Sequence, residues 1–168
     1  MGVLADRLQK QSESLKKRKE ELQAQLKDWN DSLRNLYRQI EDWLNDCDPE
    51  NLIERSIDLV SGKDPSFGEH QVPALKLKLV DDTIRFEPLS RNLAAFVKRS
   101  ELSAEEKVAG AVELIGLGGR TYYLFQLSDQ HWYVQSGYEK FRRTGSTVVP
   151  LTRELFERIV QETFYENA

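Results

Sequence analysis

The apolar residues of the first forty-odd positions recur at the spacing of a coiled-coil heptad, which is seven residues and then alternately four and three. No glycine or proline interrupts the stretch from Val3 through Asp48, and glutamine, glutamate, lysine and leucine dominate it. These residue types have high intrinsic helix propensity. The pattern therefore predicts one coiled-coil-like helix over residues 1–48, about 65 Å long.

The apolar seam of this helix changes character along its length. Each heptad has two core positions, a and d. Up to Leu22 leucines occupy the d positions, whereas the a positions hold Ala5, Ser12 and Lys19, so the apolar seam is only one leucine wide. From Leu26 onward both core positions of each heptad are apolar, which is typical of a helix that packs on a domain. We expect the first half to pair with another helix, and the second half to dock. The seam residues predicted to support self-association are Leu8, Leu15, Leu22, Leu26, Trp29, Leu33, Leu36, Ile40 and Trp43.

Two questions about this helix stay open at the level of sequence. One alternative is a monomer in which the whole helix folds back on its own domain. The residues that flank the seam, such as Gln9, Gln11, Lys16 and Arg18, lack the complementary glutamate and lysine pattern that fixes partner orientation. Parallel and antiparallel pairing are therefore both compatible with the sequence.

Residues 49–168 alternate in polarity and predict a small α+β domain, with an antiparallel sheet and flanking helices. Leu75, Leu77 and Leu79 alternate with two lysines, which is the period-two pattern of a half-buried strand. A tight turn at Asp81-Asp82 closes a hairpin over residues 74–88. In this register Leu79 lies opposite Ile84 and Leu77 lies opposite Phe86.

A three-stranded meander is predicted over residues 111–135, with turns at Gly118-Gly119 and Asp129-Gln130. Two-residue turns assign a core face of Val112, Leu114, Tyr123, Phe125, Leu127, Trp132 and Val134. The reverse face then carries Ile115, Tyr122, Leu124, Gln126, His131 and Tyr133. That second face is too apolar to meet water, so we expect the chain's own helices, or another protein, to cover it.

Helices are predicted on either side of these strands. After a break at Pro49, apolar residues at helical spacing predict a short helix from Pro49 to Val60. Within 91–110, Leu93, Phe96 and Val97 favour another short helix. A final helix over 153–165, capped by Thr152, closes the domain.

Composition and charge exclude several classes of protein. Charged residues make up 31% of the chain and the formal net charge is −4, so neither a disordered chain nor a basic nucleic-acid binder is indicated. The single cysteine, Cys47, rules out an intrachain disulfide framework and fits a reducing compartment. No apolar stretch has the length of a leader or a membrane span, so we expect a cytoplasmic protein.

No motif in the sequence specifies a reaction. The cysteine and histidine spacings of zinc sites, the phosphate-binding glycine loops and the GxSxG nucleophile motif are all absent, and we predict no metal or cofactor. Glu105-Glu106-Lys107 matches the Glu-x-Lys spacing of some metal-dependent nucleases only weakly. An enzyme of unfamiliar type would need groups such as Glu113 and His131 to converge in a pocket.

The best candidate for contact with a ligand is the loop 138–145, in which aromatic and basic residues alternate. Arginine forks and aromatic faces suit a phosphate or a single-stranded nucleic acid. The residues proposed for such contact are Tyr138, Lys140, Phe141, Arg142, Arg143 and, near them, His131.

The sequence as a whole favours a non-enzymatic scaffold or adaptor. Its partners would be a second copy of itself, through the N-terminal helix, and another protein docked by the α+β domain. A nucleic-acid-binding or nucleotide-binding accessory subunit is the alternative, and an enzyme is the second alternative.

Overall fold

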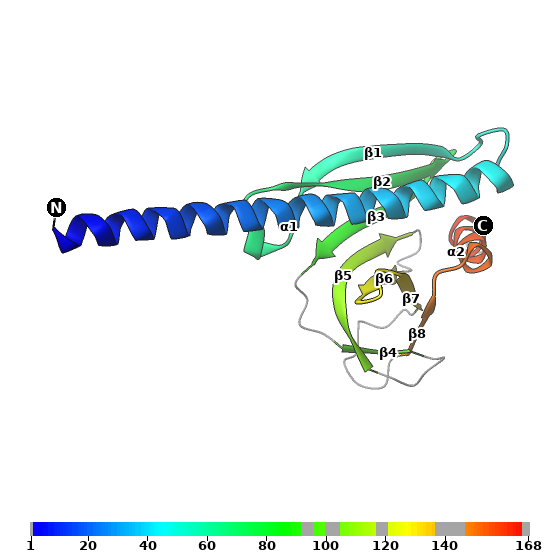
Figure 1. Ribbon diagram of the computed structural model, residues 1–168. Helices are drawn as coiled ribbons and strands as arrows, with labels where there is room; N and C mark the ends of the chain where they lie inside the picture. The colour runs from blue at the N-terminus through cyan, green and yellow to red at the C-terminus, as the bar shows by residue number, and fades with distance from the viewer. Residues whose placement is uncertain (1, 92–95, 100–104, 117–120, 137–146, 166–168) are drawn as a thin grey trace.

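The chain forms a long helix, a sheet that curls on itself and a short C-terminal helix, an α+β fold (Figure 1). The computed structural model describes residues 2–91, 96–99, 105–116, 121–136 and 147–165. The helices are α1 (Val3–Cys47) and α2 (Arg153–Tyr165), and a single 3-10 turn, η1, covers Pro65–Phe67. The strands are β1 (Glu54–Ser61), β2 (Gln71–Leu79), β3 (Asp82–Ser90), β4 (Phe96–Arg99), β5 (Glu105–Ile115), β6 (Thr121–Leu127), β7 (Trp132–Ser136) and β8 (Thr147–Pro150).

The predicted N-terminal helix is confirmed almost to the residue, and Asp48 explains where it ends. The backbone N–H of Asp48 still donates to the carbonyl of Leu44, at 2.7 Å. Its carboxylate then accepts the backbone N–H groups of Leu52 and Ile53, both at 2.9 Å, and pairs with Arg55 at 3.2 Å. One buried aspartate thus terminates α1 and folds the chain back toward the sheet.

The helix predicted from Pro49 to Val60 is wrong, because residues 49–53 form a turn and the rest belongs to strand β1. It pairs antiparallel with β2 along its whole length, from Glu54 opposite Lys78 to Ser61 opposite Gln71. The short apolar run is compatible with the 3.6-residue period of a helix and with the two-residue period of a strand, and pairing with β2 selects the strand. β1 lies at the end of the strand order, and two of its apolar side chains, Ile57 and Leu59, are exposed.

The predicted hairpin is confirmed, with its register shifted by two residues. Leu77 lies opposite Ile84 and Leu79 lies opposite Asp82, so the turn is Val80-Asp81. An even shift leaves each side chain on its original face, and the leucines still point into the core.

Val80 is expected to be a weak point of this turn. It is 79% exposed and has a φ of 57°, a region that β-branched residues avoid and that glycine enters at no cost. We expect Val80→Gly to raise the free energy of unfolding by about 1 kcal/mol, measured by urea denaturation. Val149→Gly, which removes an exposed valine from β8 where φ is not positive, should lower it; stabilisation by both changes would contradict this explanation.

The helical segment predicted within 91–110 is also wrong, because β4 and the first half of β5 occupy its described part. β4 pairs antiparallel with β5 and parallel with β8, with Lys98 opposite Thr147. β8 pairs with β7, β7 with β6, and β6 with β5. These strands therefore form a closed ring of neighbours, and β1, β2 and β3 extend from it along β5.

The predicted meander is confirmed as three strands, but its face assignment is wrong. Leu114 lies opposite Tyr122 and Val112 opposite Leu124, one residue away from the register of a Gly118-Gly119 turn. A slip of one residue moves every side chain of β6 to the other face. Tyr122 and Leu124 therefore belong with Val112 and Leu114.

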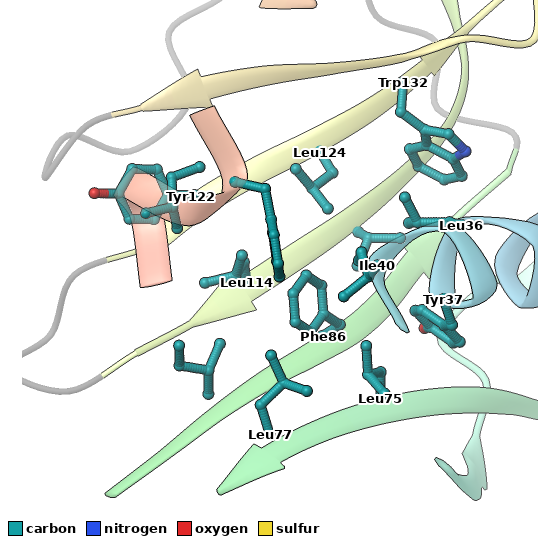
Figure 2. Packing of buried hydrophobic residues seen from close by; sticks show 14 of the residues in the cluster. Leu36, Tyr37, Ile40, Leu75, Leu77, Phe86, Leu114, Tyr122, Leu124 and Trp132 are labelled. Atoms are coloured by element: carbon teal, nitrogen blue, oxygen red, sulfur yellow. The ribbon is translucent and has the colours of Figure 1, made fainter. Parts of the chain in front are cut away.

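The strands and helices bury two apolar clusters. The larger lies between the sheet and the two helices, where Leu36, Tyr37 and Ile40 of α1 meet Phe86 and its neighbours (Figure 2). The Tyr37 hydroxyl donates to the Pro73 carbonyl at 2.8 Å, and burial raises the pKa of this tyrosine. α2 adds Phe156, which contacts Trp43 at a ring distance of 5.5 Å.

The smaller cluster belongs to the opposite face of the ring. Its buried members are Val108, Ala111, Phe125, Leu127, Tyr133 and Val148. Gly110 and Trp132 are sequence neighbours of Ala111 and Tyr133, so they lie on the other face of the ring, and Trp29 of α1 packs on them there. Because α1 covers the outer face, the smaller cluster fills the inside of the ring. The chain itself covers both faces.

Candidate functional site

The first half of α1 extends beyond the domain, with the N-terminus at its far end (Figure 1). We call residues 3–25 the projecting segment. At 1.5 Å per residue it is about 35 Å long. All of its residues are exposed except Leu22, which is half-buried. Leu8 is 56% exposed and Leu15 is 61% exposed, at the heptad spacing that the sequence analysis identified.

The second half of the seam is used by the chain's own domain. Trp29, Leu33, Leu36 and Ile40 are at most 1% exposed and belong to the larger core cluster. Leu26 and Trp43 are partly buried and pack on the same cluster. The predicted docking of the second half is confirmed, and these residues are occupied within one chain. Of the residues predicted for self-association, Leu8 and Leu15 are exposed and Leu22 is half-buried, and none of the three belongs to the core clusters.

A second feature is a cavity of about 450 Å³ between α1 and the β6–β7 turn. It contains His131, together with Gln39 of α1 and Gln126 of β6. Its full lining is Ser32, Asn35, Leu36, Gln39, Gln126, Gln130, His131, Trp132, Tyr133, Pro150 and Leu151. Amides, hydroxyls and an imidazole offer hydrogen bonds to a polar molecule, and among the described residues the lining includes no carboxylate, lysine or arginine.

The carboxylate nearest to His131 in sequence, Asp129, already holds other donors. Its Oδ1 accepts the backbone N–H of His131 at 2.9 Å, and its Oδ2 accepts the Tyr133 hydroxyl at 2.6 Å and Arg99 at 2.7 Å. Arg99 also pairs with Glu106 at 2.5 Å and lies over the Tyr133 ring. Asp129 therefore ties the turn to Arg99 of β4, which in turn pairs with Glu106 of β5.

The pKa values in this cluster follow from the same contacts. Burial and the hydrogen bond to Asp129 raise the pKa of Tyr133 to about 12. Burial acts to raise the pKa of Asp129, but the bonds from Tyr133 and from the His131 backbone outweigh it, so that pKa is lowered. An ionised Asp129 held in this way serves the fold, and the structure does not show it orienting the His131 imidazole.

The remaining predicted residues do not form a site in the described part of the chain. Glu113 lies on β5 between Glu87 and Tyr123 and does not line the cavity that holds His131. The loop of Tyr138, Lys140, Phe141, Arg142 and Arg143 falls outside the described residues. Within the described ranges there is no group of histidine, cysteine or carboxylate side chains that could hold a metal ion. Neither helix in those ranges is long and apolar enough to cross a membrane.

Comparison with known proteins adds no family to this description. No family model, no curated protein and no solved structure matches the chain. The features of the chain that bear on its function are therefore the projecting segment and the domain that holds it.

Sequence reasoning missed two features of this region. It gave no sign of the cavity, because Gln39 and Gln126 are polar residues from distant parts of the chain without a shared motif. It also missed the contact of Arg99 with Asp129, which depends on β4 being a strand.

Proposed function

We propose that this protein is a non-enzymatic interaction protein that self-associates through the projecting segment. The segment pairs with the same segment of a second copy, and the α+β domain holds it in place through the buried second half of α1. The protein then acts as a scaffold that carries two domains on one helical pair.

A single observation carries this proposal: a heptad line of leucines is exposed where α1 leaves its domain. A helix of this length and polarity is marginal in water on its own, and most helical stability in proteins comes from burying an apolar face. Leu8, Leu15 and Leu22 provide such a face, and burying each leucine side chain contributes about 1.5–3 kcal/mol. A second helix with the same repeat offers the matching surface.

Sedimentation velocity on the intact chain tests the proposal. We expect a monomer–dimer equilibrium whose dimer fraction rises over the range from about 1 to about 200 μM protein. The double change Leu8→Gln and Leu15→Gln should raise the dissociation constant by at least about 100-fold, because four leucines are lost per dimer.

The matched control also introduces two glutamines seven residues apart, but on the opposite face of the helix. Lys10→Gln and Lys17→Gln lie at the outermost heptad positions, so this variant should dimerise like the unaltered protein. A chain that stays monomeric throughout the range, or a control that dissociates as readily as the leucine variant, would overturn the proposal.

Two further kinds of partner were predicted from the sequence, a second protein and a nucleic acid. Docking of another protein by the α+β domain stays a prediction, and β1 is the surface that suits it, because an edge strand with exposed apolar residues can pair with an extended segment. The nucleic-acid alternative depends on the loop 138–145 and also stays a prediction.

A further inference from the structure

We infer that the two projecting segments pair antiparallel, so that the α+β domains lie at opposite ends of the assembly. This inference rests on the proposed self-association and adds its geometry. The sequence alone leaves the orientation open, and the position of the domain on α1 decides it.

The position of the domain on α1 restricts how a second helix can lie on the seam. α1 is one continuous rod (Figure 1). The exposed seam of its projecting segment continues into the seam that the domain covers from Trp29 onward. A straight α-helix drifts by about 20° per heptad against a seven-residue repeat, so from Leu22 to Leu36 the seam stays on nearly the same side.

Parallel pairing is incompatible with that layout. A second helix lying on the seam in the same direction would continue past Leu26, into the space that the domain fills at Trp29 and Leu33. Sliding one helix along the other changes where the helix of one copy meets the domain of the other, but does not prevent it, because both helices run toward their domains in the same direction. In the antiparallel arrangement each rod leaves the contact past residue 3 of the other helix, on the side away from the other copy's α+β domain.

Charge favours the same orientation. Lys16, Lys17, Arg18 and Lys19 form a basic run, in which Lys16 and Arg18 flank the seam and Lys19 lies in it. In a parallel pair in register, two such runs would face each other at contact distance. Antiparallel pairing sets each run beside Gln9 and Gln11 of the second copy, and separates the centres of the two runs by about 12 Å along the axis, so the like charges no longer face each other.

The exposed length of the seam also selects a register. Antiparallel packing places each leucine, at a d position, beside an a position of the other helix. The longest overlap that ends before Trp29 sets Leu15 beside Ser12 of the second copy, and Leu8 beside Lys19 of the second copy. The next longer overlap would place Ala5 of the second copy on Trp29, which the domain covers.

Pairs of spin labels measure this geometry directly. Lys10, Lys17 and Ala24 share the outermost heptad position, are exposed and can each be changed to cysteine in a Cys47→Ser chain, since Cys47 is the only cysteine and is exposed. In the antiparallel register, the two labels lie about 10 Å apart along the axis at Lys10 or Lys17 and about 30 Å apart at Ala24. We therefore expect equal distances from Lys10→Cys and Lys17→Cys, and a clearly longer one from Ala24→Cys.

The outcomes separate the inference from the proposed function. A dimer with the same distance at all three positions would be parallel, which overturns the orientation and leaves self-association intact. The absence of any dimer would overturn both. Dyes on the native Cys47 of the unaltered chain give a second readout: they lie about 100 Å apart in the antiparallel dimer and transfer no energy, whereas efficient transfer would contradict it.

Discussion

Replacing Ile40 with aspartate is expected to unfold the α+β domain. Ile40 is fully buried on the face of α1 that packs against Leu75, Phe86 and Leu114 (Figure 2). The substitution removes its apolar burial and places a carboxylate within a cluster of buried hydrophobic residues. Loss of a buried isoleucine alone costs about 2–5 kcal/mol, and burial of the charge adds to that. The sum is comparable to the whole stability of a small domain.

Urea denaturation followed by tryptophan fluorescence measures this effect, since Trp29 and Trp132 lie within the same core. The matched control is Leu8→Asp, which makes the same kind of change at an exposed seam position of the same helix. We expect the control to leave the denaturation midpoint of the domain unchanged when both proteins are measured as monomers. Equal destabilisation by the two substitutions would contradict the division of α1 into a docking half and a projecting half.

The heptad pattern predicted that division, but not the kind of surface on which the second half docks. The sequence identified the length of α1 and every buried residue of its seam, because helix propensity and apolar period agree over the whole stretch. A seam of leucine and isoleucine packs equally well on a sheet and on another helix. The identity of the covering surface at Leu33 and Ile40 is therefore a tertiary fact, which only the folded domain supplies.

The sheet shows a second limit, which is sensitivity to turn length. The hairpin of β2 and β3 was wrong by two residues, and its faces were still right. The pairing of β5 with β6 was wrong by one residue, so Tyr123 and Phe125 were assigned to the wrong face. Strand identity comes from local alternation, whereas facing depends on whether the connection holds an even or an odd number of residues.

The strands that sequence reasoning missed depend on partners far along the chain. β1 reads locally as a short helix and becomes a strand through its pairing with β2. β4 and β8 meet in parallel although about fifty residues separate Lys98 from Thr147, so no local signal could predict that contact. The candidate site is a partial exception: the change in the seam at Leu26 predicted which half of α1 docks, whereas the sheet that receives this half is assembled from distant strands.

Asp64 is expected to make the fold sensitive to acid. It precedes η1 in the connection from β1 to β2, and its side chain is almost fully buried. Its carboxylate accepts the backbone N–H and the hydroxyl of Ser66, at 3.0 and 2.6 Å. It also accepts the Ser90 hydroxyl and the Arg91 backbone N–H, both at 3.1 Å. Asp64 thereby fastens this connection to the end of β3.

The direction of the pKa shift gives the sign of the pH dependence. Burial acts to raise the pKa of Asp64, but the hydrogen bonds from Ser66, Arg91 and Ser90 outweigh it, and the pKa is lowered. Folding therefore favours the ionised form. The contribution of Asp64 is fully present above the unfolded pKa of about 3.9, and it is lost as the pH falls through the lower pKa of the folded state.

Asp64→Asn tests this contribution, because the amide keeps the shape of the side chain and has one acceptor oxygen in place of two. We expect the variant to lose about 2 kcal/mol of unfolding free energy at pH 7. Asp58→Asn, at an exposed position of β1, is the matched control and should leave stability unchanged.

The comparison that decides the question is the difference between the unaltered protein and Asp64→Asn at two pH values. At pH 7 the unaltered protein has an ionised acceptor that the variant lacks. Well below pH 4 its carboxyl takes up a proton, so both side chains are neutral and the difference should shrink. A difference that stays constant between pH 7 and about pH 3 would show that the hydrogen bonds of Asp64 stabilise the fold without depending on its charge.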